Sequence, residues 1–172
     1  MATQKGTIKK TVLAAYGNVR KGGINAINLA AGDSLIEVKM TDGKNDIVIG
    51  TSHGFAIRFN EKDVRDMGRT ATGVRGVRLG KGDRVVGLLV IRNDQTTVLV
   101  VTEKGYGKRS DINDYRITKR GGKGVITVKT TDKVGKLIAL MEVVDRDELV
   151  IISTQGMVIR QSVKDLRVMG RN

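Results

Sequence analysis

The stretch Asp46-Ile47-Val48-Ile49-Gly50-Thr51-Ser52-His53-Gly54-Phe55-Ala56-Ile57-Arg58 decides the fold of this 172-residue chain. The β-branched run predicts a strand, the second glycine predicts a tight turn, and the apolar run after it predicts the returning strand. Equivalent glycines follow one another at spacings of 48, 51 and 51 residues, as Gly6, Gly54, Gly105 and Gly156. The chain is therefore expected to repeat one hairpin-containing unit about every 50 residues.

Each full repeat contains about four strand-like segments, which in the second copy are 47–52, 55–59, 74–79 and 84–91. The best helix candidate, Glu61 to Met67, is too short to form a stable helix. Four strands in a period of this length are typical of a β-propeller blade. The sequence predicts an all-β fold, a single partial domain over residues 1–172 with about three and a half blades of an incomplete ring. The repeats are approximately 1–46, 47–96, 97–147 and 148–172.

The composition favours a polyanionic partner. Thirty-one Lys and Arg against 18 Asp and Glu give a net charge of +13, and such a surplus is typical of proteins that bind nucleic acid. With no Cys and one His, disulfides, zinc sites and a Ser-His-Asp triad are nearly excluded. No apolar run approaches the ~20 residues of a membrane span, and the N-terminus lacks the apolar core of a signal peptide. We expect a cytoplasmic protein without a membrane partner.

Residues that recur at one offset in every repeat are expected to belong to the scaffold or to a repeated binding surface. A catalytic site is normally unique, because one reacting centre needs one set of groups. Asp63, Asp114 and Asp165 occupy one offset in successive repeats and are expected to support a turn or to pair with an arginine. Tyr16 and Tyr115 share an offset with aliphatic residues, which predicts core positions for their rings. No catalytic residue and no metal ligand is expected.

The glycine-rich stretch Lys119-Arg120-Gly121-Gly122-Lys123-Gly124 resembles a phosphate loop only superficially. A P-loop needs a Ser or Thr after its lysine and a helix behind it, whereas a strand-like run follows here. We expect a turn whose amides and cations can meet a phosphate backbone.

Cations recur at fixed offsets, and equal offsets in successive blades lie at equivalent positions around the rim. They would therefore form a curved positive track, which favours bent duplex DNA over a straight rod. Single-stranded nucleic acid is a weaker candidate, because it usually needs aromatic platforms and the chain has only three Tyr and two Phe. The predicted contacts to the DNA backbone are Lys9, Lys10, Arg20, Lys21, Arg58, Arg65, Arg69, Arg75, Arg78, Lys108, Arg109, Arg116, Lys119, Arg120, Lys123, Arg160, Arg167 and Arg171.

Residues 62–79, Lys62-Asp63-Val64-Arg65-Asp66-Met67-Gly68-Arg69-Thr70-Ala71-Thr72-Gly73-Val74-Arg75-Gly76-Val77-Arg78-Leu79, closely resemble the C-terminal domain of the DNA gyrase A protein. Residues 105–109, 120–125 and 168–172 resemble it too. The resemblance implies a six-bladed β-pinwheel, a propeller whose blades exchange strands. It also implies DNA wrapped around the rim with positive handedness, in the service of ATP-driven negative supercoiling.

The same resemblance implies the partners: duplex DNA, the remainder of the gyrase A protein, and the gyrase B protein. ATP and Mg²⁺ would act elsewhere in the intact enzyme, so this chain would bind no cofactor and would not be an enzyme by itself. Its place would be the bacterial cytoplasm, in association with the nucleoid. An open arc of blades also leaves strand edges exposed, which predicts a homo-oligomer through those edges.

The match runs from the third blade of the family to early in the sixth. Residues 118–124 read Thr-Lys-Arg-Gly-Gly-Lys-Gly, close to the gyrase box but without its Gln, and look like the fifth-blade counterpart. The true box, which lies in the first blade, is expected to be absent.

Two alternatives remain open. The C-terminal domain of the corresponding topoisomerase IV protein is similar, although the regular register favours gyrase. A protein-interaction propeller of the kelch or chromosome-condensation-regulator kind is the other, and there the cations would be incidental.

Overall fold

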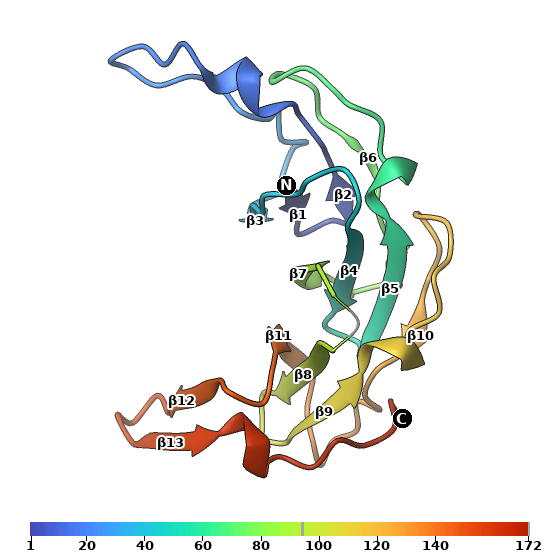
Figure 1. Ribbon diagram of the computed structural model, residues 1–172, viewed down its shortest axis with the longest axis vertical. Helices are drawn as coiled ribbons and strands as arrows, with labels where there is room; N and C mark the ends of the chain where they lie inside the picture. Colours follow the sequence, from blue (N-terminus) through green and yellow to red (C-terminus); the bar gives the residue numbers. More distant parts are fainter. Residues whose placement is uncertain (94, 172) are drawn as a thin grey trace.

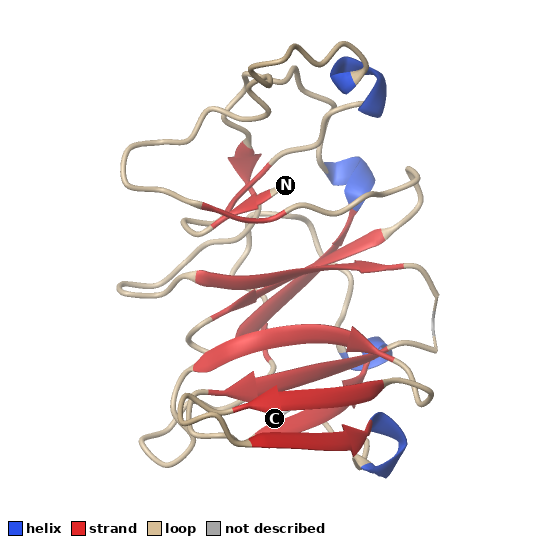
Figure 2. Ribbon diagram, turned by 90° about the vertical axis from the view of Figure 1, so that its left-hand side faces the viewer, coloured by secondary structure: helices blue, strands red, loops and turns tan. Residues whose placement is uncertain are grey.

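The computed structural model describes residues 1–93 and 95–171, and its short antiparallel sheets follow one another along an arc (Figure 1). Turned by a quarter, the sheets lie above one another as layers (Figure 2). Asn172, the last residue of the motif at 168–172, lies outside the described residues. In the described part of the chain, no helix is long and apolar enough to cross a membrane.

The first two sheets have four strands each, in the orders β3-β1-β2-β6 and β10-β5-β4-β7. The strands of the first sheet are β1 (Ala2–Thr3), β2 (Thr7–Ile8), β3 (Leu35–Glu37) and β6 (Val74–Arg75). Those of the second sheet are β4 (Asp46–Thr51), β5 (Phe55–Asn60), β7 (Val85–Ile91) and β10 (Val125–Ile126).

The remaining strands form a three-stranded sheet, β11-β8-β9, and a two-stranded sheet, β12-β13. Their bounds are β8 (Thr97–Thr102), β9 (Gly107–Asp111), β11 (Leu137–Val143), β12 (Glu148–Ile152) and β13 (Val158–Ser162). A single 3-10 turn follows the second strand of each repeat: η1 (Leu13–Tyr16), η2 (Glu61–Asp63), η3 (Ile112–Asp114) and η4 (Val163–Asp165). The short helix candidate of the second repeat is thus reduced to η2.

Each complete sheet takes its outermost strand from the following repeat. β6 belongs to the second repeat but pairs with β2 of the first, with Val74 opposite Ile8. β10 belongs to the third repeat but pairs with β5 of the second, with Val125 opposite Ala56. This exchange of strands makes the fold a β-pinwheel, so the predicted fold class is confirmed.

One predicted strand is much shorter than expected. Of the segment 74–79, only β6 (Val74–Arg75) is strand. Beyond Arg75 the backbone leaves the ladder, because the N–H groups of Gly76 and Val77 both donate to the carbonyl of Gly6. The side chain of Val77 then turns into the core, where 2% of the residue is exposed.

The core lies between successive sheets. One buried cluster joins the first two sheets through residues such as Ile8, Ile49 and Val64. The next joins the second and third sheets and contains Tyr115, whose hydroxyl bonds with the Thr127 hydroxyl. The predicted core position is therefore confirmed for Tyr115. It is wrong for Tyr16, which is only half-buried, because its own repeat is the first and no described sheet precedes it.

A recurring cation at the end of the second strand ties each repeat to the next, and we call this contact the inter-repeat clamp. Arg58 pairs with Asp46 at 2.8 Å and donates to the carbonyl of Ile112 in the next repeat at 2.9 Å. The donors of the other clamps occupy the same offset as Arg58. Lys10 donates to the carbonyl of Glu61 at 3.3 Å, and Arg109 donates to that of Leu166 at 2.7 Å.

Replacing Arg58 by Ala should lower the free energy of unfolding by about 3 kcal/mol, because it leaves a largely buried carboxylate and a carbonyl without their partner. The Arg58 side chain is only 10% exposed. The matched control is Arg160→Ala, at the same offset, whose side chain is 70% exposed and pairs with Glu148. That surface change should cost less than about 1 kcal/mol. Urea unfolding measures both, and equal losses would contradict the clamp.

Replacing Gly124 by Ala should destabilise the fold by about 2–3 kcal/mol, because it forces a backbone shift where β10 meets β5. Gly124 has a φ of +83°, and an added Cβ would lie 2.2 Å from the Ala56 carbonyl oxygen. Gly80→Ala is the control, since a Cβ there meets no atom within 4 Å. Thermal unfolding should show a lower midpoint for the first variant only.

Candidate nucleic-acid interface

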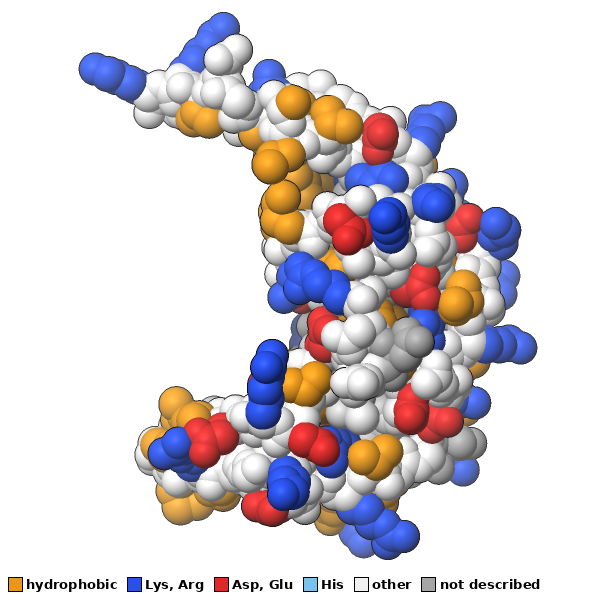
Figure 3. All heavy atoms as spheres, viewed as in Figure 1, with side chains coloured by type: hydrophobic (Ala, Val, Ile, Leu, Met, Phe, Trp, Pro, Cys, Tyr) orange, Lys and Arg blue, Asp and Glu red, His pale blue; other side chains and the backbone are white. Residues whose placement is uncertain are grey.

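The connections that follow η2 and η3 run along the convex side of the arc, outside β2 and β5, with which their short strands β6 and β10 pair (Figure 1). Lysine and arginine side chains stand out along this edge in the space-filling view, with acidic groups set between them (Figure 3). The convex side is therefore where the structure presents most of the recurring cations.

Arg65, Arg116 and Arg167 form the exposed series. Each follows the residue that anchors its connection, and in two repeats these anchors, Val64 and Tyr115, are 2% and 1% exposed. The anchor fixes the backbone while the next residue faces solvent. Within residues 1–93 and 95–171, none of the three guanidinium groups makes a hydrogen bond or ion pair, so all three are available to a phosphate.

The series Arg69, Arg120 and Arg171 is half-buried and holds the exchanged segments. Each guanidinium donates to a backbone carbonyl of the preceding repeat, at equivalent offsets. The acceptors are Asn25 at 3.2 Å, Arg75 at 2.9 Å and Ile126 at 2.8 Å. These arginines therefore support the outer strands and have part of their surface left for a ligand.

The series Arg58, Arg109 and Arg160 does not lie where a DNA contact was predicted. The side chains of Arg58 and Arg109 are 10% and 6% exposed and serve the inter-repeat clamp. Arg109 also pairs with Asp145 at 2.6 Å. Because their cationic groups face protein acceptors, these two positions are corrected to structural ones. Arg160 is exposed but paired with Glu148.

Two of the lysines that were predicted to contact DNA donate hydrogen bonds to backbone carbonyls of the protein. Lys9 is 2% exposed and donates to the carbonyl of Ala26 at 2.6 Å. Its pKa is lowered by burial and by the nearby Arg69. Lys108 donates to the carbonyl of Gly170 at 2.7 Å, and desolvation, then Arg171, lowers its pKa. Lys9 is therefore corrected to a structural residue.

The remaining lysines on the convex connections keep their ammonium groups near solvent. Lys119 is 90% exposed and pairs with Asp63 at 2.9 Å. Of the two roles expected for Asp63, supporting a turn or pairing with an arginine, the second is corrected: its carboxylate pairs with a lysine, and the residue ends the 3-10 turn η2. Lys123 lies over the ring of Phe55, 4.3 Å from its centroid. Lys10, which serves the clamp of the first repeat and does not lie on these connections, is partly exposed and pairs with Asp66.

The glycine-rich stretch 119–124 contacts the preceding repeat through its backbone. The N–H of Gly121 donates to the carbonyl of Gly76 at 2.6 Å, and the carbonyl of Gly122 accepts from the N–H of Arg78. The Gly121 amide is therefore not open to a phosphate, contrary to expectation. The side chains of Arg75 and Arg78 next to this contact are exposed.

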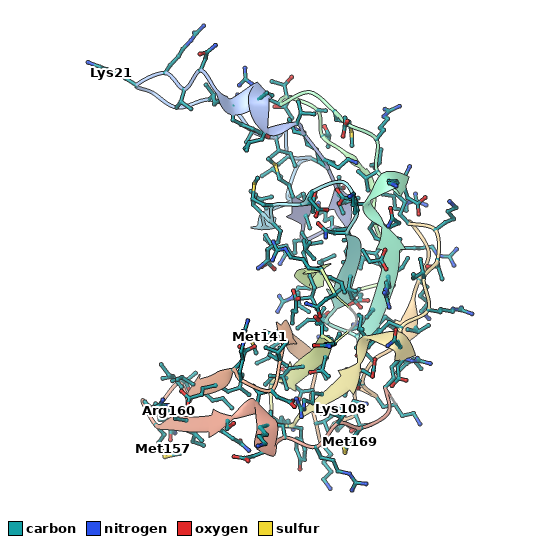
Figure 4. All side chains as sticks on the ribbon, viewed as in Figure 1. Lys21, Lys108, Met141, Met157, Arg160 and Met169 are labelled. Atoms are coloured by element: carbon teal, nitrogen blue, oxygen red, sulfur yellow. The ribbon has the colours of Figure 1, made fainter. Side chains whose placement is uncertain are left out.

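Sequence reasoning passed over further exposed cations on the same connections, namely Lys62, Lys129 and Lys164. Lys62 and Lys164 share an offset inside the 3-10 turns, a recurrence that could have singled them out. Arg20 and Lys21, which were predicted, are exposed on the segment that protrudes from the first repeat (Figure 4). No cluster of three or more potential metal-ligating side chains occurs among the residues that the structure describes.

Two solved structures resemble this arrangement over almost the whole chain. "Crystal structure of the C-terminal domain of DNA topoisomerase IV" matches with a TM-score of 0.93 and 27% identity, covering 99% of this chain and 53% of that one. "Structure of DNA gyrase A C-terminal domain" matches with a TM-score of 0.87 and 26% identity, covering 99% and 57%.

Curated relatives are closer in sequence. The chain is 47% identical to the DNA gyrase A protein of Haloquadratum walsbyi and 44% identical to that of Staphylococcus aureus, over 100% and 99% of its length. It spans only 20% and 19% of those proteins. The family model described as "DNA gyrase C-terminal domain, beta-propeller" matches residues 1–42, 45–92, 96–143 and 147–172. The chain belongs to the DNA gyrase C-terminal domain family.

Proposed function

We propose that this chain binds the backbone of duplex DNA along its convex side, without sequence preference, and bends the duplex. The observation that carries the proposal is the exposed series Arg65, Arg116 and Arg167. One cation at one offset in each of three successive repeats suits a ligand that offers a phosphate at regular intervals. Contacts to phosphate position a protein on DNA but do not read its sequence.

Curvature is the second part of the proposal. Because the cations follow an arc, a straight duplex would reach only some of them. Bending 20–30 base pairs costs about 1–6 kcal/mol by elastic estimates, and further phosphate contacts in each repeat would offset that cost. The net charge of +13 also speeds the encounter with a polyanion.

We propose further that the chain serves as an accessory part of DNA gyrase, presenting DNA to the rest of the gyrase A protein and to the gyrase B protein. The curated relatives are named as DNA gyrase A proteins. In this proposal the chain is not an enzyme by itself and binds no cofactor, while ATP and Mg²⁺ act elsewhere in the intact enzyme. The site of action would be the bacterial nucleoid.

A role in topoisomerase IV is the second candidate, because the domain of that enzyme superposes with a TM-score of 0.93. The higher sequence identity to the gyrase A proteins favours gyrase. Both candidates place DNA on the same convex side. A protein-interaction propeller is disfavoured by the exposed arginine series, and DNA binding with no dependence on salt would favour it again.

Replacing Arg65, Arg116 and Arg167 together by Ala should weaken duplex binding and flatten its dependence on salt. If each arginine neutralises one phosphate, the negative slope of log affinity against log salt should become shallower by about 2.7. The control is Lys44, Lys104 and Lys133, replaced together by Ala, which removes the same charge from other turns. Fluorescence anisotropy with a labelled duplex measures both slopes. The same loss in both variants would mean that bulk charge, and not the exposed series, drives binding.

Relaxing a plasmid in the presence of the chain should leave supercoils of one sign after the protein is removed, because duplex DNA wrapped around the rim with one handedness traps writhe. Two-dimensional gel electrophoresis reads the sign, which the family resemblance predicts to be positive. The triple arginine variant should trap less writhe at equal protein concentration. Binding without any trapped writhe would leave a backbone-binding domain that does not wrap DNA.

A further inference from the structure

The ammonium group of Lys123 lies over the ring of Phe55, where the third repeat meets the second. Phe55 begins β5, and Lys123 comes shortly before the exchanged strand β10, which pairs with β5 (Figure 1). The Nζ atom is 4.3 Å from the centroid of the ring. At this distance the negative face of an aromatic ring attracts a cation, so the two side chains form a cation–π contact.

Core packing does not account for the ring of Phe55. Its neighbours in β5, Ile57 and Phe59, are 1% and 0% exposed and belong to the buried cluster between the first two sheets. Phe55 is only half-buried, and within residues 1–93 and 95–171 it belongs to none of the three buried clusters. The chain has only two Phe, so a ring placed outside the core indicates a different role.

The preceding junction, between the first and second repeats, lacks both members of the pair. Thr7 occupies the offset of Phe55, directly after the hairpin glycine, and Thr72 occupies that of the lysine, directly before the glycine of the exchanged strand. The backbone pairing is nevertheless the same, with Arg75 opposite Thr7 and Ile126 opposite Phe55. The strand exchange therefore forms without the ring and without the lysine.

The other cations of the same loop are held in a different way. Lys119 pairs with the carboxylate of Asp63 at 2.9 Å, and Arg120 donates to the carbonyls of Asp63 and Arg75 at 2.8 and 2.9 Å. A carboxylate holds a lysine but offsets its charge. An aromatic ring holds the lysine without a net negative charge, so the ammonium group of Lys123 keeps its full charge for a phosphate.

A lysine that is already held in place binds a phosphate at a lower cost. Its flexible four-carbon stem carries much rotamer entropy, and ordering such a side chain during binding reduces the affinity. The ring orders the stem before DNA arrives. Because Lys123 is exposed, the N–H groups that do not face the ring remain free to donate to a phosphate.

We propose that Phe55 is a positioning residue for DNA binding: its ring holds the Lys123 ammonium group on the convex side, where the group meets a phosphate of the duplex. This inference rests on the proposed function, since it names the residue that prepares one of the contacts on the convex side. Phe55 itself touches no phosphate. Its contribution to the affinity for DNA therefore depends entirely on Lys123.

A double-mutant cycle with a labelled duplex, measured by fluorescence anisotropy, tests this dependence. Phe55→Leu removes the ring but keeps an apolar side chain, and it should weaken binding about threefold, the size expected of an exposed cation–π contact. Lys123→Ala should weaken binding further and make the negative slope of log affinity against log salt shallower by about 0.9. In the Lys123→Ala background, Phe55→Leu should cost nothing more.

Two outcomes of the cycle would overturn the proposal. An equal loss from Phe55→Leu with and without Lys123 would mean that the ring acts on the fold or on DNA directly. Tighter binding by Phe55→Leu would mean that the ring keeps the lysine away from DNA. Because the cycle compares the same substitution in two backgrounds, a general loss of stability does not imitate the expected result.

A conservative variant and a matched control sharpen the test. Phe55→Tyr keeps an aromatic ring and should bind DNA as tightly as the unchanged chain. The control is Tyr106→Leu, at the same offset in the next repeat, because no cation lies over that ring in the described part of the chain. It should leave the affinity unchanged. A loss in Phe55→Tyr, or a loss in the control equal to that of Phe55→Leu, would contradict a role through Lys123.

Nuclear magnetic resonance of the whole chain without DNA checks the contact separately. The ring should shift the protons on the Cε of Lys123 upfield, and the shift should disappear in Phe55→Leu and persist in Phe55→Tyr. Absence of the shift in the unchanged chain would overturn the proposal. A shift without any binding to duplex DNA would instead refute the proposed function, and the positioning role with it. Binding with a steep salt dependence that Phe55→Leu leaves unaltered would refute the positioning role alone.

Discussion

The pairing of Val125 with Ala56 joins a strand of the third repeat to a sheet of the second, and the pairing of Val74 with Ile8 does the same one repeat earlier. The rest of the molecule depends on this exchange. It lets a two-residue strand complete a sheet whose core lies one repeat away. It also fixes the connection that follows each 3-10 turn on the outside of the arc, where the exposed arginines are found.

Charge in this chain serves two purposes that composition cannot separate. Arg58 and Arg109 donate their hydrogen bonds to carbonyls of the next repeat and to carboxylates. Arg65 and Arg116 stand seven residues further along and face solvent. A buried guanidinium must be paired because desolvation is costly, whereas an exposed one can exchange counterions for phosphates. The clamps thus set the spacing of the cations that face outward.

The sequence by itself determined the repeat, the hairpin at each glycine and the all-β propeller class, since these follow from local strand propensity and turn chemistry. Its motifs also indicated the family, and the pinwheel was what that resemblance implied. The tertiary structure decided which cations are available. Arg58 and Arg65 look alike in sequence, and both recur, because a periodic fold repeats its scaffold as faithfully as its surface. Only the packing of one repeat on the next shows that Arg58 is surrounded by hydrogen-bond acceptors and Arg65 by solvent. Whether an arginine side chain is buried depends on how the neighbouring repeat packs against it, and the spacing of residues along the sequence does not show this.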